Sequence, residues 1–109
     1  MTTATASDQA LATATRDLFW ARRHRRAAEL KAGIAGMSEE GRASVERDLF
    51  RARDELVTLT ALTPLALTAI AKAGRQVAYF ATKLRAADEL PALVEAEREA
   101  TVALERARS

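Results

Sequence analysis

The chain has 109 residues, 17 of them basic and 15 acidic, and it contains no cysteine. This near balance of charge argues against a polycation, and the lack of cysteine excludes disulfides and thiolate metal sites. Alanine is roughly a quarter of the residues and, with abundant Leu, Arg and Glu, favours helix throughout. The length suits one domain, so we expect a single helical domain over residues 7–109 after a disordered segment at 1–6.

The first predicted helix begins near Ser7, which can cap it, with Asp8 in the first turn where the helix dipole favours a negative charge. It runs to about Ala32, because Gly33 and Gly36 follow and either can adopt the left-handed conformation that ends a helix. The residues before it are small and polar and resemble no targeting signal.

Two apolar stripes, each with the 4-3 spacing of one helix face, run toward each other about Pro64. Paired positions sum to 125 or 126, so we predict a coiled-coil-like antiparallel hairpin in which Ala52 faces Ala73. Ser38 is the predicted N-cap of its first helix, and Thr63 before Pro64 is the predicted start of its second. The stripes comprise Val45, Leu49, Ala52, Leu56 and Leu59, then Ala66, Ile70, Ala73, Val77, Phe80, Leu84 and Ala87.

Pro91 is the predicted start of a fourth helix, because the residue before a proline disfavours α geometry. Four long helices joined by short turns predict an all-α fold, an antiparallel up-down bundle of four helices. In the register that the turn at 33–38 implies, Phe19 of the first helix faces Ala52 of the second. The fourth helix would lie against the third through a stripe of mostly small residues, Leu93, Ala96, Ala100, Ala103 and Ala107.

The most distinctive local segment is the basic run from Trp20 to Arg26. Its arginines point in almost every direction around a helix, so this turn cannot be wholly buried. Arginine makes charge-assisted, often bidentate hydrogen bonds to phosphate, which makes nucleic-acid binding one candidate function. No known nucleic-acid-binding motif accompanies the run. The candidate phosphate-binding residues are Arg16, Arg22, Arg23, Arg25, Arg26 and Lys31.

The alternative is that acidic residues of the second helix neutralise these arginines within the chain. Each exposed ion pair contributes only about 0–1 kcal/mol, so such pairs indicate register more than stability. On this interpretation, which we favour, no nucleic acid binds at physiological salt. The pairs implied by the bundle register are Arg16–Glu55, Arg23–Asp48, Arg25–Glu46 and Glu29–Arg42.

No catalytic or metal site is predicted. His24 is the only histidine, and no Ser or Asp partner is identifiable at catalytic spacing. The carboxylates of the second helix fall off its apolar stripe and are expected to be solvated. We therefore expect no cofactor, no metal and no enzymatic activity. The longest run without charge, residues 56–71, is too short to span a bilayer, so we expect a cytoplasmic protein without a transmembrane segment.

Apolar residues remain on helix faces that one bundle core does not use. Trp20 lies about 100° from Phe19 around the helix, so it either covers the side of the bundle or anchors a partner. Leucines around Pro64 form an apolar end that we expect the first helix to cover, with part of it used in self-association. The second, third and fourth predicted helices each carry a second apolar stripe outside the core. These stripes are Phe50, Val57 and Ala61 on the second helix, Leu67, Ala71, Gly74, Ala78 and Ala81 on the third, and Val94, Thr101 and Leu104 on the fourth.

These unused faces predict a non-enzymatic interaction or structural module. It would form a homo-oligomer or dock a helix of another protein, with nucleic acid a less favoured partner. The chain resembles many small bacterial or phage helical proteins only in this general pattern, without a family motif. The predicted interface residues are Phe50, Val57, Gly74, Ala78, Ala81 and Trp20.

Overall fold

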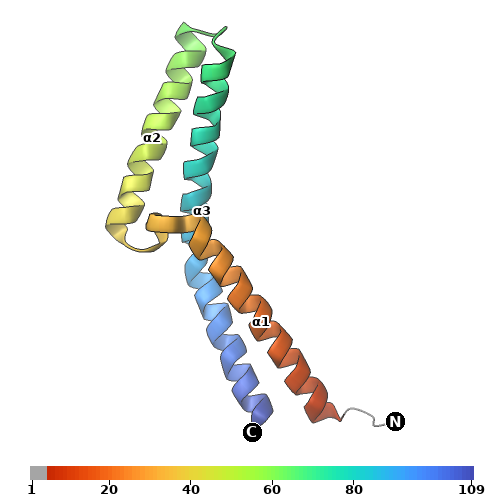
Figure 1. Ribbon diagram of the computed structural model, residues 1–109. Helices are drawn as coiled ribbons and strands as arrows, with labels where there is room; N and C mark the ends of the chain where they lie inside the picture. Colours follow the sequence, from red (N-terminus) through yellow and green to blue (C-terminus); the bar gives the residue numbers. More distant parts are fainter. Residues whose placement is uncertain (1–4) are drawn as a thin grey trace. The chain divides into compact units, whose positions relative to one another are not determined.

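The computed structural model describes residues 5–109. Its elements are α1 (Ala6–Ala32), the short 3₁₀ helix η1 (Gly33–Gly36), α2 (Glu39–Leu62) and α3 (Leu67–Arg108), as Figure 1 shows. No strand occurs in this range, so the all-α class is confirmed. The predicted four-helix bundle is wrong, because the described range holds three α-helices.

A separate fourth helix is missing because α3 continues through Pro91 without a break. Proline lacks the N–H that would bond the carbonyl of Ala87 and therefore usually ends or kinks a helix. Here Leu90 occupies the place where a new helix would need Ser, Thr, Asn or Asp as its cap. Strong helix formers on both sides keep the segment helical. The residues of the predicted fourth helix thus belong to the helix against which they were expected to pack.

The starts of α1 and α2 are both capped by side chains. Ser38 caps α2 as predicted, since its Oγ accepts a hydrogen bond from the N–H of Gly41 at 3.0 Å. In α1 the cap is Thr5 instead of Ser7. The Thr5 hydroxyl accepts from the N–H of Asp8 at 3.1 Å, and the Thr5 N–H donates to the Asp8 carboxylate at 3.2 Å. This reciprocal arrangement satisfies two backbone groups at once.

The turn between α2 and α3 differs from the prediction. Thr63 closes α2, because its N–H donates to the carbonyl of Leu59 at 2.9 Å. Its hydroxyl also donates to the carbonyl of Leu59, at 3.1 Å, and it lies four residues before the start of α3, so it is not the N-cap of the next helix. The chain passes through Pro64 in the turn, and α3 begins at Leu67.

Contacts group the chain into two compact units, which are described separately. Unit 1 combines the residues up to 28 with residues 89–109, and unit 2 covers residues 29–88. In unit 1, α1 pairs with the C-terminal part of α3, and in unit 2, α2 pairs with the N-terminal part of α3 (Figure 1). The single domain at 7–109 stays a prediction, and residues 1–4 of the expected disordered segment lie outside the described range.

In unit 2, both predicted apolar stripes lie on the buried side of the helix pair. Val45, Leu49 and Ala52 of α2 are buried, and Leu56 and Leu59 are half-buried. Ala73 of α3 is buried as well, and the other six members of its stripe are half-buried. The small side chains in the middle of the pair permit the two helix axes to approach closely.

One end of unit 2 is closed by η1, which packs against α2. Gly33 has a φ of +53°, in the left-handed region that favours glycine, so the predicted end of the first helix is confirmed. Ala32 and Ala35 are buried beside it. Gly41 in the first turn of α2 approaches η1 so closely that a Cβ at this position would overlap the carbonyl oxygen of Ile34.

We expect Gly41→Ala to lower the free energy of unfolding by about 1–3 kcal/mol, because the overlap with Ile34 is relieved only by moving backbone. Gly74→Ala is the matched control: Gly74 is also helical, but its Cβ would meet nothing within 4 Å. That variant should gain about 0.5–1 kcal/mol from the better helix propensity of alanine. Urea denaturation at low protein concentration measures both. Equal effects of the two substitutions would contradict the close approach of η1 and α2.

Ala52→Leu should overpack the middle of unit 2 and cost roughly 1–3 kcal/mol, since Ala52 and Ala73 are both almost fully buried. The same change at Ala61, which is exposed on α2, should stay within about 0.5 kcal/mol of wild type. Urea midpoints give the comparison. An unchanged midpoint for Ala52→Leu would show that the predicted pairing register is wrong.

Candidate interaction surfaces

The side of α1 that packs in unit 1 follows a regular 3-4 spacing. Ala14 and Leu18 are buried with Leu104 of α3 in one cluster, against which Ala100 and Ala107 pack. We call this contact the unit 1 seam. Its α1 members are Ala14, Leu18, Ala21, Arg25 and Ala28, and its α3 members are Leu93, Glu97, Ala100, Leu104 and Ala107.

This seam corrects several sequence-based expectations. Phe19 is 56% exposed, so it does not fill a waist of small residues. Leu104 belongs to the buried cluster and not to a second, open stripe. Ala96 and Ala103, which were expected to pack inward, are exposed. The true α1 stripe was present in the sequence as a 3-4 repeat, but alanines and one arginine occupy most of it.

Two arginines of the predicted phosphate-binding set are held by Glu97 within unit 1. The Glu97 carboxylate accepts hydrogen bonds from Nε of Arg25 and, at 3.4 Å, from Nε of Arg22. The side chains of Arg25 and Glu97 are only 21% and 19% exposed. The hydrogen bond from Arg25, and then the positive charges of Arg25 and Arg22, hold the pKa of Glu97 below its ordinary value, although burial acts in the opposite direction.

The arginines therefore have an acidic partner inside the chain, but it comes from α3 and not from α2. The step from Leu18 to Arg25 on α1 is seven residues, as is the reverse step from Leu104 to Glu97 on α3. The ion pair and the leucine contact thus follow one antiparallel register. Elsewhere Arg16 lies 3.7 Å from Asp17.

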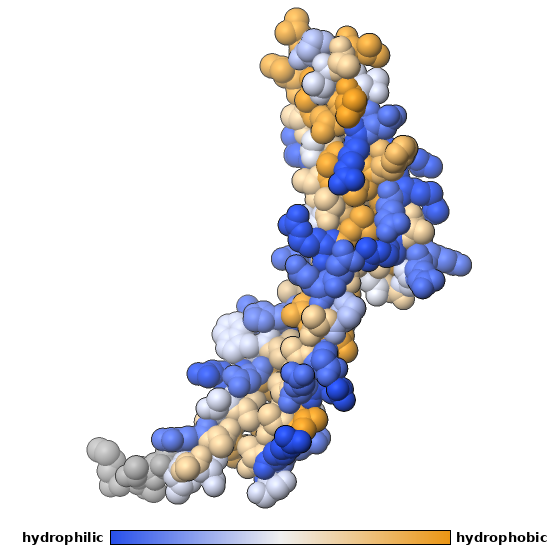
Figure 2. Space-filling model, turned by 180° about the vertical axis from the view of Figure 1, so that it is seen from behind, coloured by the Kyte–Doolittle hydropathy of each residue, from blue (hydrophilic) through white to orange (hydrophobic). Residues whose placement is uncertain are grey.

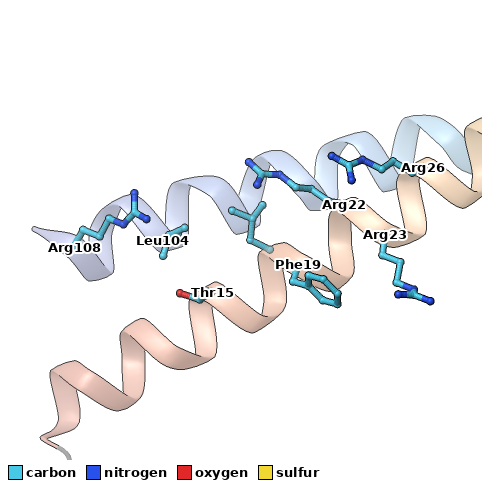
Figure 3. A pocket seen from close by; sticks show the side chains of 8 residues that line it. Thr15, Phe19, Arg22, Arg23, Arg26, Leu104 and Arg108 are labelled. Atoms are coloured by element: carbon cyan, nitrogen blue, oxygen red, sulfur yellow. The ribbon is translucent and has the colours of Figure 1, made fainter.

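Beside the ion pair, unit 1 has a groove of about 510 Å³ with an apolar floor and a rim of arginines (Figure 3). Leu18 and Leu104 are buried at its floor, and Phe19 forms part of its wall. In Figure 3, Arg22 and Arg26 extend toward α3, whereas Phe19 and Arg23 point away from it. We call this feature the arginine groove. Its lining residues are Thr15, Leu18, Phe19, Arg22, Arg23 and Arg26 of α1 with Leu104 and Arg108 of α3.

Most of the rim charge of the arginine groove is not neutralised. Within residues 5–109, Arg23, Arg26 and Arg108 form no ion pair with a carboxylate. Arg23 lies 5.7 Å from the centroid of the Trp20 ring, at a cation–π distance. Lys31, the remaining member of the predicted phosphate-binding set, is exposed in unit 2 and does not line the groove.

Of the predicted interface residues of unit 2, three are exposed and two are half-buried. Phe50 is 73% exposed and Val57 is 67% exposed on α2. On α3, Gly74 is half-buried with open space where a side chain would extend, Ala78 is exposed and Ala81 is half-buried. The structure does not test whether they form an interface, which stays a prediction.

The α2–α3 turn is also uncovered. Leu62, Leu65 and Leu67 are exposed there, and Figure 2 shows hydrophobic side chains gathered at this end of the helix pair. Within unit 2, nothing covers these leucines, and the expectation that the first helix covers this end stays a prediction. In unit 1, Trp20 is exposed and makes an edge-on contact with Phe19, with 5.4 Å between ring centroids.

Comparison of the chain with models of protein families, with curated proteins and with solved structures gave no match. Across residues 5–109, no helix combines the length and the apolar character that a membrane span needs. Within the same range, no three or more His, Cys, Asp or Glu side chains are grouped so that they could hold a metal ion.

We expect Glu97→Gln to flatten the acid dependence of stability. Because the folded-state pKa of Glu97 lies below the ordinary 4.5, its stabilising contribution is complete above that value and is lost as pH falls through the lowered pKa. The wild-type Tm should therefore fall more steeply than that of the variant between about pH 5 and pH 3. Glu105→Gln is the control, since Glu105 is exposed on the same helix and has no ion pair in the described range. Identical slopes for all three proteins would contradict a stabilising role for the ion pair.

Proposed function

We propose that the protein is a non-enzymatic interaction module that works by self-association or by docking a helix of a partner. The observation that carries the proposal is that each unit consists of one pair of helices, which buries one side of each helix and leaves the other sides open. Each unit is shorter than 70–80 residues, a size below which a single core rarely supplies more than about 3–5 kcal/mol. Further apolar contacts would add to this small stability.

The composition of the cores supports the proposal. Within residues 5–109, seven of the eleven buried apolar residues are alanines, which bury little area each. Large apolar side chains such as Phe50, Val57 and Leu65 remain exposed. Complete burial of one such side chain contributes about 1.5–3 kcal/mol. Covering one of these side chains would therefore stabilise the protein more than a buried alanine of the existing cores does. At the α2–α3 turn the exposed Leu62, Leu65 and Leu67 are gathered at one end, and contiguous exposed apolar residues are typical of sites that contact another molecule.

Nucleic acid is the alternative partner, and the ion pairs of unit 1 disfavour it. Arg22 and Arg25 are engaged by Glu97, and Arg16 lies beside Asp17. The charge left for phosphate contacts is therefore smaller than the sequence alone indicates. We favour protein association because the exposed apolar residues, unlike the arginines, have no use in binding a phosphate backbone.

The wild-type protein should associate as its concentration rises from low to high micromolar, measured as native mass by light scattering or sedimentation. A Phe50→Ser/Val57→Ser variant should need at least about tenfold more protein to associate, because it removes two apolar contacts. Thr58→Ser, an exposed polar change on the same helix, should behave as wild type.

A strictly monomeric wild-type mass at high micromolar concentration would refute the proposed function. The measurement is repeated at two salt concentrations with duplex DNA present. Tight binding of DNA that weakens steeply with salt would support the nucleic-acid alternative instead.

A further inference from the structure

We propose that the arginine groove of unit 1 receives the exposed face of α2 from a second copy of the chain. This inference rests on the proposed function, because it names the partner and the contact for self-association. It is carried by the match between two surfaces, one on each unit, in the order and spacing of their apolar and charged residues.

The arginine groove has an apolar centre with positive charge on both sides. Leu18 and Leu104 lie at one level of the helix pair. Arg22 follows Leu18 by four residues, one turn or about 6 Å along α1. Arg108 follows Leu104 by the same step on α3, and because the two helices are antiparallel it lies one turn to the other side of the centre. Arg23 and Arg26 add charge on the Arg22 side.

The exposed face of α2 carries the complementary order. Phe50 lies at its centre, with Glu46 four residues before it and Asp54 four residues after it. At 100° per residue, both carboxylates fall within about 40° of Phe50 around the helix and about 6 Å along it. We call this face the acidic stripe. Its members are Glu39, Ala43, Glu46, Phe50, Asp54, Val57 and Ala61, all exposed except the half-buried Ala43.

The two surfaces therefore match in both kinds of contact along the line of the stripe, whereas the exposed Arg47 and Arg53 lie at its edges, about 60° from Phe50. With Phe50 placed on the floor formed by Leu18 and Leu104, the carboxylates of the stripe reach the levels of the rim arginines. An aromatic anchor in an apolar depression, surrounded by charge pairs, is the arrangement that dominates the energetics of many interfaces. The charge pairs would also select the register in which the helix docks.

A second copy is the occupant that this chain itself specifies. α1 carries a run of arginines and α2 carries acidic residues, but within one copy the Arg22 and Arg25 side chains bind Glu97 of α3. Within residues 5–109, the rim residues Arg23, Arg26 and Arg108 have no ion-pair partner. On the acidic stripe, Asp54 has none either, whereas Glu46 binds Arg42 of the same helix at 3.1 Å with its side chain still 53% exposed. The contact joins different surfaces of two copies. Two copies that each place α2 in the groove of the other form a closed dimer, and a contact made in one direction only forms rings or open filaments.

A charge-swap experiment tests this contact directly. Arg23→Glu/Arg26→Glu reverses the groove without touching the arginines that bind Glu97, and Glu46→Arg/Asp54→Arg reverses the stripe. Each variant alone should need at least about tenfold more protein to associate, because like charges then face each other. An equimolar mixture of the two should recover association and give a mixed assembly by native mass. Far-UV circular dichroism verifies that both remain helical.

Two control variants reverse charges outside both surfaces. Glu55→Arg changes an exposed residue of α2 about 140° from Phe50, and Arg85→Glu changes an exposed arginine of α3 that does not line the groove. Both should associate as wild type does.

The outcomes separate this inference from the proposed function. A wild-type protein that stays monomeric at high micromolar concentration overturns both. A wild type that associates while either reversed variant associates equally well overturns the groove–stripe contact alone. Loss of association in each variant without recovery in the mixture also overturns the groove–stripe contact, because the groove and the stripe then do not bind each other. Loss of DNA binding with unchanged association would assign the groove to nucleic acid.

Discussion

The packing of helices in pairs is the constraint on which the rest of the structure depends. α3 is one member of both pairs, since its N-terminal part packs with α2 and its C-terminal part with α1. A helix in a pair buries one stripe of residues and leaves the remainder of its surface in solvent. The alanines in the seams bring the axes close together but contribute little buried area. The exposed faces of α1 and α2 follow from this arrangement.

The Arg25–Glu97 pair gives the unit 1 seam a feature that apolar packing lacks. Alanine-rich seams are nearly uniform, so a shift of one helix along the other costs little in contacts. Placing an arginine and a glutamate at facing, half-buried positions makes such a shift costly, because it would leave each charge against apolar residues. A polar pair of this kind is best known for fixing register, and here it aligns with the contact of Leu18 and Leu104.

Sequence alone predicted the parts of the fold that have strong local or periodic signals. The stripes of α2 and α3 are regular and contain large apolar residues, and Ser38 and Gly33 have distinctive roles at helix ends. The α1 side of the unit 1 seam was missed because Arg25 interrupts its apolar pattern. The large apolar residues Phe19 and Trp20 instead suggested a different buried face, although both are exposed. The continuity of α3 was missed because it depends on two opposing effects. Pro91 disfavours the helix, its neighbours favour it, and no single residue shows which effect is larger.

The candidate surfaces were predicted in part for similar reasons. Phe50 and Val57 stood out because they are large, apolar and off the main stripe of α2. The role of Glu97 as the partner of two arginines depends on which helices pair. The sequence analysis paired the first helix with the second, whereas in unit 1 it pairs with the C-terminal part of α3. Arg108 joins the arginine groove only because α3 returns along α1, a contact between residues far apart in the chain.

Hydrogen–deuterium exchange at low and high protein concentration tests most directly whether another helix covers the open faces. Amide protection over residues 15–26 of α1 and 46–57 of α2 should rise with concentration, because the docked helices open less often. Protection over η1, which is packed within its own unit, should change little. Identical exchange at both concentrations across α1 and α2 would contradict association through these faces.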